Sequence, residues 1–435
     1  MSSPVSVKSL VRLPALDTDR LLWYNLQYTR KEGISMQMPE RARIRALKEE
    51  VIKHIEENNV RNFPGCEGKL FLISTAYPGV WLEHAYDAVS YANYTPEGRQ
   101  VLAGEMRLFL DRQREDGQLP CYVLDETIAP QKGYKTMIGF GQIQECVSFT
   151  ALCLEAAEML GDEVFLAEAY EKCARWEGWL VRNRMTTQDE LVETFCVFDT
   201  GHDNSARLTG IPNGCPSEYA ANRPDVKELP LLSPDVNAVF FGTRMALSKM
   251  AERLGRNEEA RIWREKAENV RAAILQRLYD PETDYFYDVD AQGRMRKYLS
   301  ISAMSLYQEH VLEGDAAERI YRKHFRNPAE FWTAFPFPSL AANDPAFRKT
   351  RTGNDWGYYS EGLTALRALR WMDDYGKSDD LNELLSRWVM ALANAENSRF
   401  AQEIDPLTGE PAQVSQWYSS AMLLFLHGVK RLGLA

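Results

Sequence analysis

Two short polar stretches, far apart in the chain, contain the residues best suited to chemistry. Residues 199–207 read DTGHDNSAR and residues 402–410 read QEIDPLTGE. Each stretch combines carboxylates with turn-forming residues and has little apolar cover. Cleavage of a glycosidic bond requires one carboxylic acid to protonate the leaving oxygen and a second carboxylate to activate water or attack carbon. Asp203 and Glu403 are therefore a candidate pair, provided that the fold brings them together.

Both stretches also allow a purely structural interpretation. Asp and Asn side chains bond to nearby backbone groups, so residues 199–207 could be a turn that caps another element. The sequence DPLTG at 405–409 is a strong turn signal, so Glu403 could lie in a surface turn. The catalytic interpretation depends on the two stretches meeting in space.

Further residues could bind a sugar near this pair. Asn204 and Arg207 could bind hydroxyl groups or orient a carboxyl group, and Gly201 permits a close backbone approach. The predicted substrate-binding residues are Trp81, Gln118, His202, Asn204, Arg207, Trp356, Tyr358, Glu361 and Trp417. Asp355 and Glu361 are spare carboxylates that could replace either member of the pair. Each Trp could equally pack in the core, because aromatic side chains are common core fillers.

Apolar residues recur with a helical period in twelve segments, which predicts an all-α fold. The expected helices cover 41–58, 80–92, 95–114, 141–160, 163–184, 234–254, 257–278, 299–309, 314–324, 357–373, 379–395 and 414–432. Many neighbouring helices are separated by two to four residues, and such short loops produce antiparallel hairpins. Six hairpins indicate a single (α/α)6 barrel over residues 38–435, with residues 1–37 as an extension packed on it. An α-solenoid is the alternative, although no fixed-period repeat supports it.

The remaining connections are long. Residues 115–139, 185–233, 326–356 and 396–413 contain Gly, Pro, Asp and aromatic residues, and loops of this length usually carry function. Because the loops that link hairpins gather at one end of such a barrel, we expect the site there. Alternating aromatic and turn residues at 278–293 predict a short β-hairpin.

Composition limits the classes of function. The 435 residues include 51 Lys plus Arg and 62 Asp plus Glu, with a formal net charge of −11. These charges are interspersed, which argues against nucleic acid and anionic membrane surfaces as partners. The chain has no run of 18 apolar residues and no apolar segment near its start, so we expect no membrane span, no signal peptide and a cytoplasmic location.

The sequence motifs predict no cofactor and no metal. The seven Cys form no CxxC pair, and no zinc spacing, phosphate loop or dinucleotide motif occurs. We therefore expect reduced thiols and a small carbohydrate or glycoside as the partner. A homo-oligomer stays an open alternative.

Several motifs resemble those of inverting enzymes in glycoside hydrolase families 37 and 63, which include trehalase-like, glucosidase-like and mannosylglycerate or glucosylglycerate hydrolase-like members. DTGHDNSAR resembles the family signature ESGWDxSxR, and EIDPLTGE at 403–410 resembles ExYDPxTG. The stretch FLDRQREDGQLP at 109–120 is similar to the family's QxxDGxLP loop. These similar motifs occur over residues 80–430 in the same order as in the family. Their order is more specific than any single motif.

This resemblance implies an (α/α)6 barrel that cleaves an α-glycosidic bond with inversion. Asp203 would be the general acid and Glu403 the general base. The sequence departs from the family at Asp199 and His202, where Glu and Trp are usual, and at Glu83, where the usual pair is Trp-Asp. Rival interpretations on the same barrel are a sugar 2-epimerase, which needs central His residues, and a polysaccharide lyase, which needs an Arg-rich site. A non-catalytic helical scaffold is the rival from another class.

Overall fold

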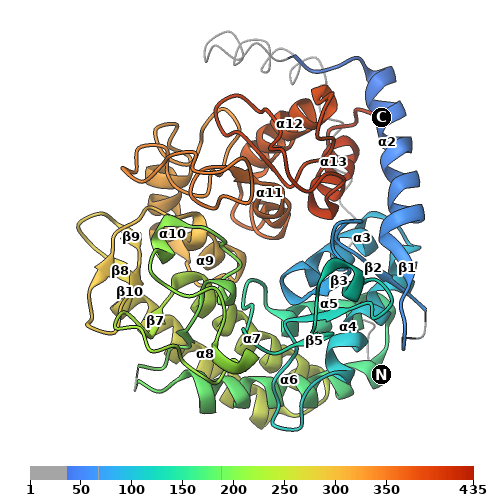
Figure 1. Cartoon of the computed structure of the whole chain (residues 1–435). Helices are drawn as coiled ribbons and strands as arrows, with labels where there is room; N and C mark the ends of the chain where they lie inside the picture. Colours follow the sequence, from blue (N-terminus) through green and yellow to red (C-terminus); the bar gives the residue numbers. More distant parts are fainter. Residues whose placement is uncertain (1–36, 67, 188) are drawn as a thin grey trace, which may run out of the picture.

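The computed structural model describes residues 37–66, 68–187 and 189–435, and it has the predicted double ring of helices (Figure 1). The inner helices are α3 (Ala85–Tyr94), α5 (Phe149–Leu160), α7 (Pro234–Arg253), α9 (Ser305–Gln308), α11 (Gly362–Arg367) and α13 (Ser419–Arg431). The outer helices are α2 (Arg41–His54), α4 (Gly98–Asp111), α6 (Glu163–Arg184), α8 (Asn257–Arg277), α10 (Gly314–Ile320) and α12 (Ser378–Asn394). Residues 1–36, where an extension was expected, lie outside the described residues.

Burial distinguishes the two rings. In α7, 16 of 20 residues are buried, whereas α8 buries 5 of 21 along a single face. A helix covered on all sides must be inside, and a helix with one apolar stripe covers it from outside. The inner helices pack side by side, and α13 lies against α3, so the last helix closes the ring beside an early one (Figure 1). This closure confirms an (α/α)6 barrel and excludes an open solenoid.

Connection length decides where the site lies. The inner helices α3, α5, α7 and α9 each lead to the next outer helix through a short loop, such as Gly161-Asp162 between α5 and α6. Asp162 begins α6 by accepting a hydrogen bond from Phe165 N at 2.8 Å, and Gly161 ends α5 with a left-handed φ of 65°. The long connections run from outer to inner helices. They therefore gather at the end of the barrel where the inner helices begin.

Short strands stiffen these long connections. They are β1 (Val60–Asn62), β2 (Lys69–Phe71), β3 (Gly79–Trp81), β4 (Tyr122–Leu124), β5 (Ile138–Gly139), β6 (Glu193–Thr194), β7 (Leu231–Leu232), β8 (Tyr279–Asp280), β9 (Tyr285–Phe286), β10 (Asp288–Val289), β11 (Met295–Arg296), β12 (Ser360–Glu361) and β13 (Glu403–Ile404). The hairpin predicted at 278–293 is present as the antiparallel pair β8–β9. The pair β12–β13 sets Glu361 directly opposite Glu403.

Five inner helices begin later than predicted. The segments expected from 80, 141, 299, 357 and 414 become α-helical at Ala85, Phe149, Ser305, Gly362 and Ser419, the first and third of these after short 3-10 turns at Leu82–His84 and Ile301–Met304. Some residues before these starts, such as Trp81 and Tyr418, are aromatic because they line the cavity at this end of the barrel, so they extend the apolar pattern without being in an α-helix. Among the described residues no helix is long and apolar enough to cross a bilayer.

Candidate active site

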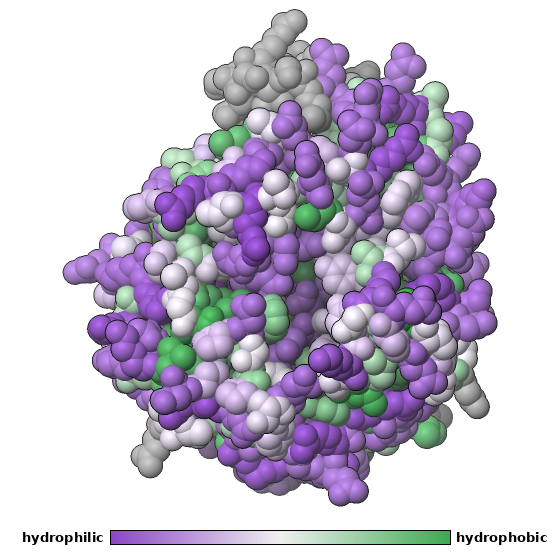
Figure 2. All heavy atoms as spheres, viewed as in Figure 1, coloured by the Kyte–Doolittle hydropathy of each residue, from purple (hydrophilic) through white to green (hydrophobic). Residues whose placement is uncertain are grey.

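A cavity of about 400 Å³ opens where the inner helices begin. This volume lies in the range that binds small ligands. The lining is largely aromatic and polar, with Tyr77, Trp81, Tyr122, Tyr134, Phe140, Phe198, Trp356 and Tyr418 beside Glu83, His84, Gln142, Gln144, Asp203, Glu218, Asn354 and Gln402. Viewed as in Figure 1, the molecule is hollowed near its centre, with mostly hydrophilic side chains around the hollow (Figure 2).

Asp203 lies in the cavity wall. Its Oδ2 accepts a hydrogen bond from Asn354 Nδ2 at 3.1 Å, and its backbone carbonyl accepts one from Trp356 N at 3.2 Å. Burial, and then the charge of Glu83, raise the pKa of Asp203 to about 7. The carboxyl group is therefore protonated in much of the protein near neutral pH.

Gly201 allows Glu83 to approach this stretch. Gly201 has a φ of 68°, and a Cβ added there would lie 2.4 Å from Glu83 Oε2 and 2.9 Å from Cys146 Sγ. A side chain at 201 would therefore displace Glu83 from the wall beside Asp203. The expected close approach at Gly201 is confirmed.

Glu403 is fully buried directly behind the cavity. Its carboxylate accepts hydrogen bonds from the backbone N–H groups of Asn354 and Asp355, the second at 3.3 Å. Gly353 covers it closely, because a Cβ there would lie 2.9 Å from Glu403 Oε1. Burial raises the pKa of Glu403, while the hydrogen bonds to its carboxylate oppose that effect. The neighbouring residue Gln402 lines the cavity itself.

One residue connects the two candidate carboxyl groups. Asn354 donates its side-chain N–H to Asp203 and its backbone N–H to Glu403. The stretches at 199–207 and 402–410 therefore meet, as the pairing of their carboxylates requires. Asn354 was not among the predicted site residues, because a single amide in a long loop gives no sequence signal.

Glu361 and Glu403 form a buried acid pair. They face each other across β12 and β13, and Glu361 is 1% exposed. Both oxygens of Glu361 lack other hydrogen-bond partners in the described part of the chain. Burial and the adjacent Glu403 raise the pKa of Glu361 well above its ordinary value, so its protonated oxygen can donate to Glu403. Glu361, like Glu403, is not among the described residues that line the cavity, and it lies opposite Glu403 in the β12–β13 pair.

His84 is held as a cation in the floor of the cavity. Its Nδ1 lies 3.0 Å from Asp87 Oδ2, and its Nε2 lies 3.2 Å from Glu83 Oε1 and 2.8 Å from Tyr418 Oη. Burial alone would lower the pKa of His84, but the two carboxylates outweigh it and raise the pKa to about 9. Both ring nitrogens are therefore already occupied.

Trp81, which was predicted to bind substrate, lies in an aromatic wall of the cavity. Its ring centroid is 5.2 Å from that of Tyr77, 5.7 Å from Tyr122 and 6.4 Å from Tyr134. Trp356 also lines the cavity and stacks on His202 at 4.2 Å. His202 itself lies behind Trp356, and burial lowers its pKa well below the ordinary value.

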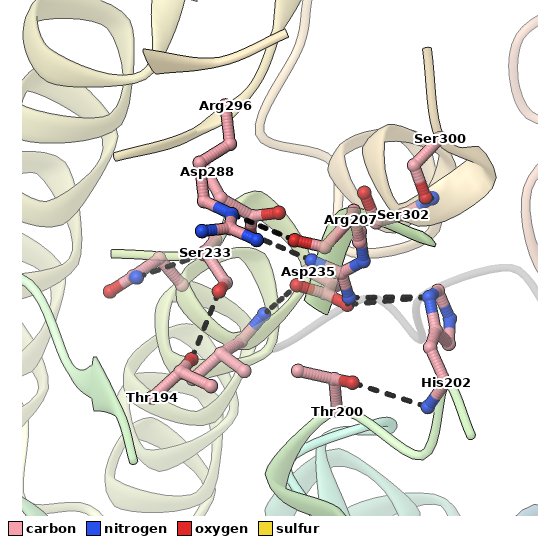
Figure 3. A network of polar contacts seen from close by, with 12 residues as sticks. Thr194, Thr200, His202, Arg207, Ser233, Asp235, Asp288, Arg296, Ser300 and Ser302 are labelled. Carbon is pink, nitrogen blue, oxygen red and sulfur yellow. Dashed lines mark hydrogen bonds and ion pairs between the residues drawn. The ribbon is translucent and has the colours of Figure 1, made fainter. Parts of the chain in front are cut away.

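Arg207 lies outside the cavity lining, in a network of polar contacts with Asp235, Asp288 and His202 (Figure 3). It is 1% exposed and forms ion pairs with Asp235 and, at 2.7 Å, with Asp288. Its Nη2 also lies 3.2 Å from His202 Nδ1. The two carboxylates neutralise this guanidinium, although its buried Nε has no partner among the described residues, and Arg207, predicted to bind substrate, lies outside the cavity lining.

Four other predicted binding residues also lie outside the cavity lining. Gln118 is buried and donates to Phe140 O at 2.9 Å, so it supports the wall from behind. Asn204 is exposed and donates to Asn354 O at 2.8 Å. Tyr358 donates to Asp405 Oδ2 at 3.1 Å, and Trp417 stacks on His54 of α2 at 4.3 Å. Trp417 therefore packs the barrel wall.

The hydrogen bonds of Asp355 indicate a structural role. Its Oδ2 accepts hydrogen bonds from the backbone N–H groups of Thr350 and Arg351 at 2.9 and 3.1 Å, and its Oδ1 accepts one from Gly357 N. These bonds shape the loop that presents Asn354. Asp355 is therefore an anchor for the loop and lies outside the cavity lining.

One group of side chains is arranged like a set of metal ligands. The ligand atoms of Cys196, Asp199 and Cys215 lie within 4.8 Å of one another. Arg184 fills this position as a cation, with its Nη1 2.6 Å from Asp199 Oδ2 and its Nη2 3.6 Å from Cys215 Sγ. These residues fit an arginine, and they do not fit a metal.

Sequence reasoning also missed much of the aromatic wall. Tyr77, Tyr122, Tyr134 and Tyr418 line the cavity but were not selected. Tyr122 and Trp81 are register partners in β3–β4, so an alternating pattern near 120 was the signal available. The other tyrosines reach the cavity only through tertiary packing.

Comparison with known proteins identifies the family. Residues 83–420 match the mannosylglycerate hydrolase MGH1-like glycoside hydrolase domain. No curated protein matches the sequence significantly. The fold is similar to that of the GH63 mannosylglycerate hydrolase from Thermus thermophilus, solved with Tris and D-glycerate, with a TM-score of 0.67, 16% identity, and coverage of 87% of this chain and 99% of that chain.

Two further solved structures share the barrel. The neutral trehalase of Saccharomyces cerevisiae has a TM-score of 0.60 and 12% identity, covering 95% of this chain and 85% of that chain. A GH78 family rhamnosidase from Bacillus sp. GL1 has a TM-score of 0.56 and 14% identity, covering 91% of this chain and 36% of that chain. At these identities the structures support the fold alone. The family match covers most of the described barrel, so this chain belongs to the MGH1-like glycoside hydrolases.

Proposed function

We propose that the protein hydrolyses an α-glycosidic bond in a small sugar or glycoside with inversion, with Asp203 as general acid and Glu403 as general base. The observation that carries this proposal is the single asparagine, Asn354, that hydrogen-bonds both carboxyl groups at the end of the barrel. An inverting mechanism needs two carboxyl groups roughly 6.5–9.5 Å apart, with a water between the base and the sugar. The shared asparagine keeps the two carboxyl groups close to each other, which is compatible with this arrangement.

The surroundings of Asp203 suit a general acid. A general acid must keep its proton until the leaving oxygen needs it, so its pKa should lie near the working pH. The pKa of about 7 at Asp203 meets this requirement, and Arg207 does not oppose it because Asp235 and Asp288 neutralise that cation. Asp203 also lines the cavity directly, within reach of a bound glycoside.

Glu403 can act as the base once it gains access to water. Its carboxylate is bound by two backbone N–H groups, and Glu361 can donate a further hydrogen bond that favours its ionised form. The loop carrying Gly353 and Asn354 covers one carboxylate oxygen, so release of that oxygen toward the cavity is part of this proposal. The geometry favours Glu403 over Asp355, whose oxygens are bound within their own loop.

The histidines weigh against the epimerase alternative. Among the described residues His84 is the one histidine in the lining; both its nitrogens are occupied and its pKa is about 9, so it cannot accept a proton from a sugar near neutral pH. The family match favours a hydrolase for the same cavity.

Substrates with different leaving groups test the two roles separately. We expect Asp203→Asn to lower kcat by at least about 100-fold on an unactivated α-disaccharide, and much less on the matching α-glycosyl fluoride, whose leaving group needs little proton assistance. Glu403→Gln should lower kcat on both substrates, because both require activated water.

The exposed carboxylate Glu410 supplies a control in the same loop, and Glu410→Gln should retain wild-type rates. Full activity of Asp203→Asn on the disaccharide, or of Glu403→Gln on the fluoride, would overturn the assignment. Glu83→Gln measured beside them would show whether that cavity carboxylate acts as the base instead.

A further inference from the structure

The family description names mannosylglycerate, whose glycerate group is an anion. The charged side chains of this cavity wall do not suit such a ligand. The ionisable side chains of the wall include the carboxyl groups of Glu83, Asp203 and Glu218. Neither Lys nor Arg occurs among the lining residues in the described part of the chain. A carboxylate on a ligand usually requires such a cation, ideally the two-pronged guanidinium of Arg.

The cations close to the cavity are bonded to other groups or lie outside its lining. His84 is protonated, but Glu83 and Asp87 bind its two nitrogens. Arg367 lies behind the wall and donates to Glu83 O at 2.8 Å. Arg351 lies outside the lining and donates to Asn204 Oδ1. His84 and Arg367 are buried and bonded within the protein; Arg351 is exposed and its charge opposes the rise in the pKa of Asp203, but its side chain lies outside the cavity lining.

The neutral groups of the wall suit hydroxyls instead. The lining includes the amides of Gln142, Gln144 and Asn354. Gln144 is 5% exposed, and its Oε1 has no partner in the described residues, so it lacks a hydrogen-bond donor. The amide oxygens of cavity-lining residues can accept a hydrogen bond from a ligand hydroxyl, whereas a carboxylate has no hydrogen to donate. The aromatic wall around Trp81 offers faces for an apolar sugar or polyol surface.

We propose that the group released by this enzyme is a neutral polyol or sugar, and that glycosides of carboxylate-bearing groups such as glycerate are discriminated against. This inference rests on the proposed function and narrows its substrate class. It departs from the substrate named in the family description, because the wall described here repels a carboxylate and lacks its counter-ion. A carboxylate bound beside Glu218 or Glu83 would lose hydration without gaining a partner.

Two substrates that differ only at the carboxylate test this directly. Glycosylglycerol and glycosylglycerate, prepared as α-glucosides and as α-mannosides, have the same size and linkage position. We expect kcat/KM for the glycerol compound to exceed that for the glycerate compound at least tenfold, which corresponds to about 1.4 kcal/mol. A smaller preference, or a preference for glycerate, would overturn the inference.

A variant that removes the negative charge of Glu218 tests whether this charge causes the discrimination against glycerate. Glu218 is exposed at the cavity and accepts a hydrogen bond from Thr136 Oγ1 at 2.6 Å, which Gln can retain. Glu218→Gln should narrow the glycerol-to-glycerate ratio at least threefold, whereas the control Glu410→Gln should leave it unchanged. An unchanged ratio in Glu218→Gln would contradict an origin in the charge of the wall.

The α-glucosyl and α-mannosyl fluorides separate this inference from the proposed function. Hydrolysis of a fluoride combined with a preference for glycerate would overturn the neutral leaving group and retain the glycosidase. No hydrolysis of any fluoride or glycoside would overturn the proposed function, and the inference would fall with it.

Discussion

Replacement of Asp203 by Asn should stabilise the protein at alkaline pH and leave its stability almost unchanged in acid. Asp203 has a pKa of about 7 in the folded protein and 3.8 as its ordinary value. A raised pKa means that the folded state binds the proton more tightly than the unfolded chain. Wild-type stability is therefore fully present below about pH 3.8 and decreases as the pH rises to about 7.

The magnitude follows from that interval. Each pH unit between the two pKa values lowers the free energy of unfolding by about 1.4 kcal/mol, so the total is about 4 kcal/mol at pH 8. Asn has the same shape, remains neutral and can still accept the hydrogen bond from Asn354. The variant should avoid this loss.

Urea unfolding followed by Trp fluorescence at pH 4, 5.5, 7 and 8.5 measures the effect. The free energy of unfolding of Asp203→Asn minus that of the wild type should be below about 1 kcal/mol at pH 4, rise with pH and level off above pH 7. The exposed Asp225→Asn is the control and should give a difference that does not change with pH. A difference for Asp203→Asn that is independent of pH would refute the argument that burial and Glu83 hold this carboxyl group protonated.

Other predictions concern the pH profile, the ion-pair network and the aromatic residues. The kcat/KM should decrease as the pH rises above about 7, because Asp203 loses its proton, and Glu83→Gln should shift this decrease to lower pH; an unshifted profile would contradict the influence of Glu83. Arg207→Met should lower the free energy of unfolding by about 3–5 kcal/mol, because it leaves two buried carboxylates without a cation, and an unchanged urea midpoint would contradict this role. Trp81→Ala should raise KM at least about tenfold with little change in stability, because the ligand ring loses a stacking surface. Trp417→Ala should lower stability by about 3 kcal/mol and leave KM unchanged, and the reverse pattern in this pair would exchange their roles.

The helical pairs could be predicted because their signals are local. Apolar periodicity locates each helix, and loops as short as Gly161-Asp162 leave no topology other than a hairpin. The starts of the inner helices were placed too early because residues before them, such as Trp81 and Phe140, are apolar as cavity lining. Periodicity cannot distinguish a residue that faces a cavity from one that faces a core.

The carboxyl pair could be proposed because its two stretches are polar inside otherwise apolar sequence. The partners of those carboxyl groups could not, because they come from loops that meet only in the folded barrel. Asn354 is one polar residue in a long loop, and nothing nearby in sequence marks it. Arg207 is marked in the sequence, but its role is not. An arginine beside a candidate catalytic stretch looks the same in sequence whether it binds a sugar or, as here, forms ion pairs with Asp235 and Asp288.

The anomeric form of the first product tests the central proposal most directly. Proton NMR recorded within the first minutes of hydrolysis of a cleaved α-glycoside distinguishes the released sugar before it mutarotates. With Asp203 as acid and Glu403 delivering water to the opposite face, the β-anomer should appear first and the α-anomer should follow slowly. Initial release of the α-anomer would contradict the account, because it would require a carboxylate to attack the sugar in place of water.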